Sequence, residues 1–189
     1  MPIIAGRASA AYGAGFAAIT APPYAGPFGA YDNIAAITIP TGGVSSITFD
    51  GIPTGYKHLQ IRGVVLTSGT TNPTWRVNND ITTTNYKGHH LWGTGTSAAS
   101  NDQTGTVYWN YNPSSSYPSS FIMDWLDYAS TTKFKTMRTF AGSDTNGGTE
   151  EGAIWSGLYM STNAINSITL LGNGVNFAQH SHFALYGVK

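Results

Sequence analysis

The sequence predicts an all-β protein, a jelly-roll-like antiparallel β-sandwich with an extended N-terminal arm. Three observations support this fold class: many short runs of β-branched and aromatic residues, turn residues between nearly all of these runs, and no sustained helical apolar period. A chain of 189 residues can bury one sizeable core. We therefore expect a single sandwich domain, residues 33–189, preceded by an arm, residues 1–32.

The arm is rich in Ala, Gly and Pro and carries few large side chains. Glycine loses the most backbone entropy on ordering, so this segment cannot bury enough apolar surface to fold alone. We expect it to run over a neighbouring subunit and to make few hydrogen bonds within its own domain. Its larger side chains are the candidate partner-binding residues: Ile3, Ile4, Arg7, Tyr12, Phe16, Tyr24 and Phe28.

The expected strands are short and are bounded by Gly, Asn, Ser, Thr or Pro. Between the first two lies Pro40-Thr41-Gly42-Gly43, a turn that predicts a β-hairpin. In the third, polar residues alternate with apolar ones, which indicates one solvated and one buried face. The strands are expected at 34–39, 44–50, 57–67, 75–78, 86–92, 106–111, 120–126, 133–140, 153–160, 165–171 and 182–188.

Aromatic residues recur at a spacing of two within several of these strands. Trp125 shares its parity with Phe121 and Met123, so we expect all three to face the core, while Asp124 takes the opposite, polar face. An exposed aromatic could instead stack on sugar rings. The candidate glycan-stacking residues are Trp92, Trp109 and Tyr111.

Charge and cysteine content exclude several functions. Nine Lys and Arg residues balance nine Asp and Glu residues, and only 10% of the chain is charged, so no basic footprint for nucleic acid or for an acidic membrane is present. The absence of cysteine excludes disulfides and thiolate metal sites. No run of about 18 apolar residues and no secretory signal pattern occurs, so we expect neither membrane spanning nor secretion by a signal peptide.

No motif predicts a cofactor, a metal or a catalytic centre. The patterns G-x-G-x-x-A at 13–18 and at 93–98 lack the preceding strand and following helix of a dinucleotide site, and the second continues into a Ser/Asn loop. His89-His90 and His180-x-His182 are histidine pairs, and the second pair would share a strand face, but the sequence supplies no third metal ligand.

Three segments resemble small virion structural proteins of tailed bacteriophages: residues 52–63 (IPTGYKHLQIRG), 127–136 (DYASTTKFKT) and the closing 177–189 (FAQHSHFALYGVK). The Gly/Ala-rich opening, residues 5–16, fits the same pattern. The resemblance implies a β-sandwich that attaches to a capsid or a tail, commonly as a symmetric oligomer. It transfers no catalytic residue.

Our first hypothesis is a capsid decoration, or cement, protein that stabilises the capsid lattice. It would bind the major capsid protein through the arm and itself as a homotrimer, on the capsid surface of the virion, without enzymatic activity. The alternative is a tail-fibre or receptor-binding module that contacts tail proteins and host surface glycans. A glycan hydrolase is the third hypothesis, because paired carboxylates can cleave glycosidic bonds. Its candidates are Asp124, Asp127, Glu150 and Glu151.

Overall fold

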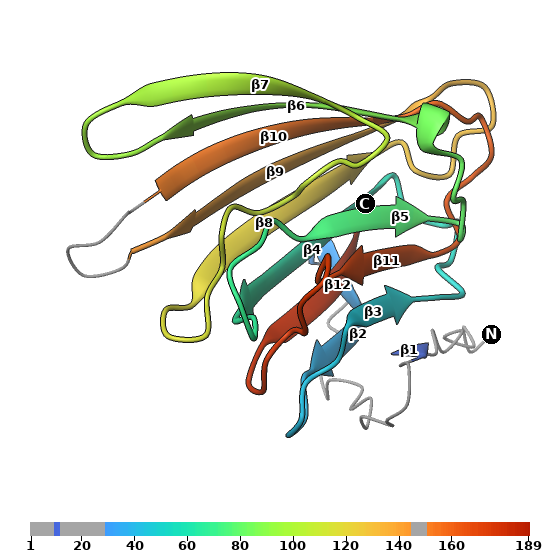
Figure 1. The fold of residues 1–189 in the computed structure, drawn as a ribbon. Coiled ribbons are helices and arrows are strands. Elements are labelled where there is room, and N and C mark those ends of the chain that lie inside the picture. The colour runs from blue at the N-terminus through green and yellow to red at the C-terminus, as the bar shows by residue number, and fades with distance from the viewer. Residues whose placement is uncertain (1–9, 12–28, 145–150) are drawn as a thin grey trace.

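The computed structural model describes residues 10–11, 29–144 and 151–189, which form two antiparallel sheets (Figure 1). The smaller sheet has the strand order β1-β3-β11-β5, and the larger sheet has the order β2-β12-β4-β8-β9-β10-β6-β7. Within the described residues the helical content is one short 3-10 turn, η1 (Thr83–Asn85). The predicted all-β antiparallel sandwich is confirmed, and the jelly-roll connectivity stays a prediction.

The strand bounds follow the turn residues closely. The smaller sheet contains β1 (Ala10–Ala11), β3 (Ser46–Phe49), β5 (Thr74–Val77) and β11 (Ile168–Leu171). The larger sheet contains β2 (Tyr31–Thr38), β4 (His58–Val65), β6 (Tyr86–Gly93), β7 (Ala98–Thr104), β8 (Ser119–Leu126), β9 (Lys135–Ser143), β10 (Glu151–Tyr159) and β12 (His182–Val188).

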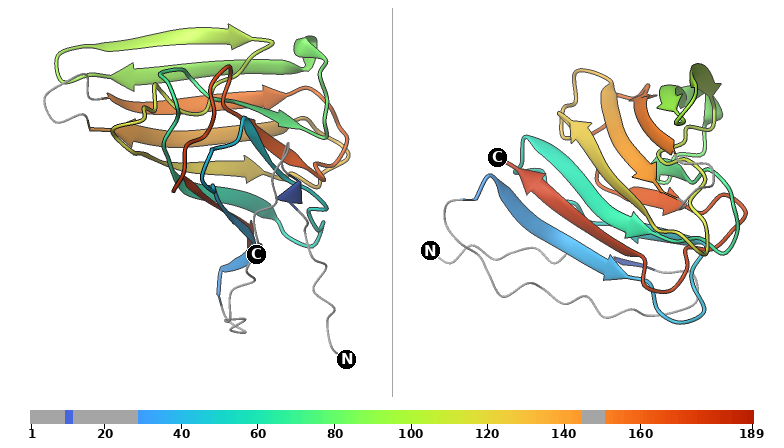
Figure 2. Two further views of the ribbon diagram at one scale, coloured as in Figure 1. Left: turned by 60° about the horizontal axis from the view of Figure 1, so that its bottom comes forward. Right: turned by 90° about the vertical axis from the view of Figure 1, so that its left-hand side faces the viewer.

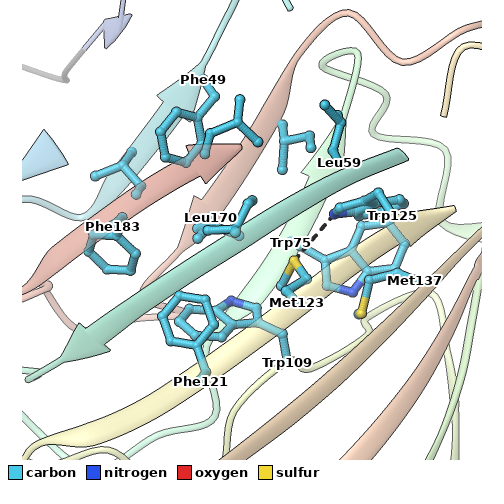
Figure 3. Close-up of a cluster of buried hydrophobic side chains, with 14 of the residues drawn as sticks. Phe49, Leu59, Trp75, Trp109, Phe121, Met123, Trp125, Met137, Leu170 and Phe183 are labelled. Atoms are coloured by element: carbon cyan, nitrogen blue, oxygen red, sulfur yellow. Dashed lines mark hydrogen bonds between the residues drawn. The ribbon is translucent and has the colours of Figure 1, made fainter. Parts of the chain in front are cut away.

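The core lies between the two sheets, and aromatic side chains fill much of it. Trp125 and Met123 are fully buried on one face of β8, and Phe121 lies beside them, as their shared parity predicts. Trp75 of the smaller sheet meets Trp125 edge to face, with ring centroids 4.8 Å apart (Figure 3). The Trp125 indole Nε1 donates to the Met123 sulfur at 3.3 Å.

The larger sheet curls around the smaller one and extends beyond it (Figure 2). Part of the uncovered inner face is closed by residues 105–118, which cross in front of the sheet in Figure 1. Trp109 of this segment is fully buried against Phe121, Phe177 and Phe183, and its Nε1 donates to the Thr74 carbonyl at 3.0 Å. The segment therefore belongs to the core although it is mostly irregular.

The predicted hairpin between the first two strands is wrong. Gly42 and Gly43 do take positive φ, but β2 and β3 lie in different sheets. Both strands contribute large apolar residues to the same core, including Ile37 and Phe49. Placing the strands in opposed sheets lets these side chains pack against a common interior.

Two further strand predictions are corrected. The segment 106–111 is not a strand, because it forms only an isolated bridge between Tyr108 and Thr74. The Ser/Asn-rich segment predicted as a loop is instead the edge strand β7, which pairs with β6 through the backbone. Its side chains are mostly exposed, so it lacks the apolar alternation that marks a half-buried strand.

The described part of the predicted arm touches its own domain. Ala10 and Ala11 pair with Phe49 and Thr48 at the edge of the smaller sheet. At the other end of the arm, β2 already begins at Tyr31, which pairs with Val188. The candidate partner-binding residues lie outside the described residues: Ile3, Ile4, Arg7, Tyr12, Phe16, Tyr24 and Phe28.

Candidate docking surface on the larger sheet

A row of large apolar side chains crosses the outer face of the larger sheet. Ile122, Phe140, Ile154 and Leu91 stand directly opposite one another on β8, β9, β10 and β6. Their exposed fractions are 43%, 64%, 51% and 53%. We call these four residues the outer row. Each has strand neighbours that face the core, so normal strand alternation holds the row in solvent.

One flank of the outer row is nearly flat because it is built from small residues. Ser120, Gly142, Gly152 and Gly93 lie opposite one another on the same four strands. An open depression of about 860 Å³ lies along this flank and reaches Ile122 and Phe140 of the row. Another apolar surface could therefore approach this part of the sheet closely.

The other flank is polar. Asp124, Arg138, Ser156 and His89 lie opposite one another across β8, β9, β10 and β6, and His89 Nδ1 lies 3.4 Å from an Asp102 carboxylate oxygen on β7. The outer face therefore carries an apolar centre beside a charged border. Polar rims of this kind surround the apolar centres of protein interfaces.

Arg62 of β4 lies at the β8 end of the outer row and is held in place. Its guanidinium carbon lies 4.6 Å from the Tyr31 ring centroid and 5.3 Å from that of Tyr186. Arg62 also donates to the Gln60 side-chain oxygen, and Gln60 in turn donates to Asp124 at 2.7 Å. These contacts fix the polar border before any partner binds.

The predicted glycan-stacking residues divide into one buried and two half-buried side chains. Trp109 offers no accessible ring face, because the core encloses it, so this candidate is wrong. Trp92 and Tyr111 stack with ring centroids 6.1 Å apart, and the His90 ring stacks on Trp92 with centroids 4.5 Å apart. Trp155 extends the series to the core, with its ring 5.9 Å from that of His90.

The electrostatics of this ring series follow from burial. Desolvation, together with the neighbouring His89, lowers the pKa of His90, which favours the uncharged imidazole. The Gln103 amide lies 3.1 Å from His90 Nδ1. Burial and the charge of Glu151 raise the pKa of Tyr111. Burial also raises the pKa of Glu151, whose Oε2 is enclosed without a hydrogen-bond partner among the described residues.

The other carboxylates of the hydrolase hypothesis serve local structure. Asp124 accepts from Gln60 on the outer face, where its opposite parity to Trp125 places it. Asp127 follows β8 and pairs with Lys133, and its backbone N–H donates to His58 Nδ1 at 3.0 Å. The hydrogen bond and charge of Lys133 hold the pKa of Asp127 below the ordinary value. Glu150 lies outside the described residues.

The histidine pairs do not form a metal site in the part of the chain that the structure describes. His182 begins β12 and shares a hydrogen bond with Thr38, while His180 lies in the preceding turn at φ 73°, so the predicted shared strand face is wrong. No group of three or more His, Cys, Asp or Glu side chains there could hold a metal ion. Nor do the described residues contain a helix long and apolar enough to cross a membrane.

Sequence reasoning missed the outer row. The signal was present, since Ile122, Phe140 and Ile154 are apolar residues on the parity opposite to the core residues of their strands. A strand with apolar side chains on both of its faces indicates that both faces of the sheet are covered.

Comparison with protein-family models, curated proteins and solved structures found no match to this chain.

Proposed function

We propose that this chain is a virion structural protein of a tailed bacteriophage, a capsid decoration protein that stabilises the capsid lattice. One observation carries the proposal: a domain whose buried apolar residues already form one cluster still presents the outer row to solvent. Contiguous apolar surface of this kind is typical of proteins that function within an assembly.

The chemistry of the remaining surface supports the same function. The low charge and zero formal net charge allow copies to pack densely without strong repulsion. The sequence resemblance supplies the type of particle, and the arm supplies the proposed contact with the major capsid protein. In this proposal the protein acts through many weak contacts repeated by symmetry and catalyses no reaction.

Copy number and location in purified virions test this proposal. Quantitative mass spectrometry should find the chain in an amount comparable with that of the major capsid protein, and cryo-electron microscopy should place it on the head. A few copies confined to the tail would overturn the decoration function. Absence from the virion would overturn a structural role of either kind.

The receptor-binding alternative is favoured by a separate observation, the half-buried pair Trp92 and Tyr111. Aromatic rings at a surface can stack on the apolar faces of sugars. If this alternative holds, the chain should bind host surface polysaccharide, and Trp92→Ala should abolish the binding. A matched Tyr117→Ala variant, altered at an exposed tyrosine outside the ring series, should bind normally.

A further inference from the structure

We propose that the outer row binds a second copy of this chain, so that two larger sheets stack face to face about a two-fold axis. The axis runs along the strands and passes between β9 and β10. This inference rests on the proposed function in one respect, that it treats the outer face as an assembly surface. It goes further by identifying the partner as a second copy of the chain. It replaces the homotrimer of our first hypothesis with a dimer.

The outer row is complementary to itself under this symmetry. Its order along β8, β9, β10 and β6 is Ile122, Phe140, Ile154 and Leu91. A two-fold axis between β9 and β10 reverses that order in the second copy. Phe140 then faces Ile154 of the second copy, and Ile122 faces its Leu91. Every member of the row is covered by another member, as an isologous contact requires.

The polar border is complementary under the same operation. Asp124 on β8 faces His89 of the second copy on β6, and Arg138 faces Ser156. Further out, Gln60 on β4 faces Asp102 on β7. No two like charges face each other directly in this row, and the nearest like pair is Arg138 with Arg138 of the second copy, one strand spacing apart across the axis.

The next row of residues along the strands, beyond the polar border, also places no like charges directly opposite each other. Lys87 on β6 faces Leu126 of the second copy on β8, and Thr136 faces Leu158. Arg62, at the end of the outer row, faces Ser100 on β7. The group directly opposite each charged side chain in these rows is therefore neutral or oppositely charged.

The dimensions of the face set an upper limit on the area that a second copy can contact. The strands from β4 to β7 span about 29 Å at the usual spacing, and an eight-residue strand is about 26 Å long. Taken as flat, this face has an area of roughly 750 Å², against ~800 Å² per partner in a standard interface. Because the sheet curls around the smaller one (Figure 2), its outer face is convex, and the contact with a second copy centres on the outer row. The glycine flank, with Gly93, Gly142 and Gly152, adds no bulk that would hold the sheets apart at one side.

Sedimentation velocity on the full chain over a range of concentrations tests the proposal. The wild-type chain should sediment as a dimer at high concentration. Phe140→Asp should raise the dimer dissociation constant at least about tenfold, because it buries an unpaired carboxylate near the axis. Ile81→Asp is the matched control, since Ile81 is highly exposed and lies in the connection between β5 and η1, outside the strands that form this face.

Because Phe140 projects into solvent, its replacement should leave the core and the far-ultraviolet circular dichroism unchanged. A monomeric or trimeric wild-type chain would overturn the proposal, as would a dimer that Phe140→Asp leaves intact.

Cross-linking tests the orientation of the two copies. The chain contains no cysteine, so Ile122→Cys and Leu91→Cys can be introduced into separate chains and mixed with a short bis-maleimide. The mixture should cross-link more efficiently than either chain alone, because the axis places residue 122 opposite residue 91. Equal cross-linking in all three samples would contradict this axis.

The dimer and the virion function fail independently. A monomeric chain that is abundant on capsids would refute the dimer alone. A dimeric chain that is absent from virions would refute the virion function alone.

Discussion

Single aromatic side chains account for much of the packing in this sandwich, and Trp125 is the clearest case. It is fully buried, packs on Trp75, and satisfies its indole N–H through the Met123 sulfur. Trp125→Ala should lower the free energy of unfolding by about 3 to 5 kcal/mol, since it removes a large apolar group and leaves a cavity. Urea denaturation measures the effect, and a loss below about 1 kcal/mol would contradict the packing described.

A glycine at the end of the last strand shows how closely some rings approach the backbone. A Cβ added at Gly187 would lie 2.3 Å from Cγ of the Tyr56 ring. Gly187→Ala should therefore displace this ring and destabilise the protein by about 1 to 3 kcal/mol. Thermal unfolding provides the measurement. Gly55→Ala is the matched control, because Gly55 lies outside the proposed dimer face and no atom lies within 4 Å of a Cβ placed there, and an equal loss in both variants would refute the steric cause.

Strands are joined by polar contacts as well as by apolar packing, and Asp80 is an example between β5 and β6. Its carboxylate accepts from the Thr82 backbone N–H at 2.8 Å, from Asn85 at 2.7 Å and from the Tyr159 hydroxyl at 2.9 Å. Burial alone would raise the pKa of Asp80, but these hydrogen bonds outweigh it and lower the pKa from 3.8 to about 2. The connection after β5 is thereby tied to the end of β10.

The lowered pKa of Asp80 fixes the direction of the pH dependence. The ionised carboxylate stabilises the native state above pH 3.8, and this contribution is lost as the pH falls toward about 2. The shift corresponds to about 2 kcal/mol, and solvent screening reduces this to about 1 kcal/mol. Asp80→Asn should remove that acid-dependent component from thermal unfolding curves. Asp50→Asn, at an exposed turn, should retain it, and identical pH profiles for all three proteins would contradict the assignment.

At the level of the strands, the sequence predicts well those elements whose side chains alternate between core and solvent. The strand 120–126 corresponds to β8 (Ser119–Leu126), because alternation and flanking turn residues both mark it. The edge strand β7 could not be predicted in this way, since backbone pairing with β6 holds a mostly exposed polar segment. The failed hairpin has a different cause, because a local turn pattern does not reveal which sheet the next strand joins.

The candidate surface was less predictable than the fold. Spacing places Ile122 opposite in parity to Trp125, but its alignment with Phe140 and Ile154 depends on the order and register of separate strands. Trp109 shows the opposite error, a residue that the sequence suggests is exposed but that the fold buries. An aromatic among Tyr and Asn residues suggests exposure, whereas the irregular segment that carries it folds over the inner sheet face and buries it. Long-range pairing decides both outcomes.

For the whole molecule, the boundary between arm and domain yields the last prediction. The core residues that the structure describes lie between Ala35 and Leu185. The described contacts of residues 1–30 are the pairing of β1 with the edge of β3 and a hydrogen bond from the Lys189 N–H to the Ala30 carbonyl. Deleting residues 1–30 should therefore leave a folded sandwich with a cooperative thermal transition, because every core residue that the structure describes lies outside the deleted segment. The same deletion should weaken attachment to the capsid, since the arm is the proposed contact with the major capsid protein.

Binding to capsids that lack the protein separates these two effects. The truncated chain should bind much less than the full chain, whereas full-length Phe140→Asp retains the arm and should still attach. Because truncation also exposes the edge of β3, sedimentation must show that the truncated chain is not aggregated. A truncated chain without a cooperative transition would show that the arm contributes to folding. A folded truncated chain that bound as tightly as the full chain would assign attachment to the sandwich itself.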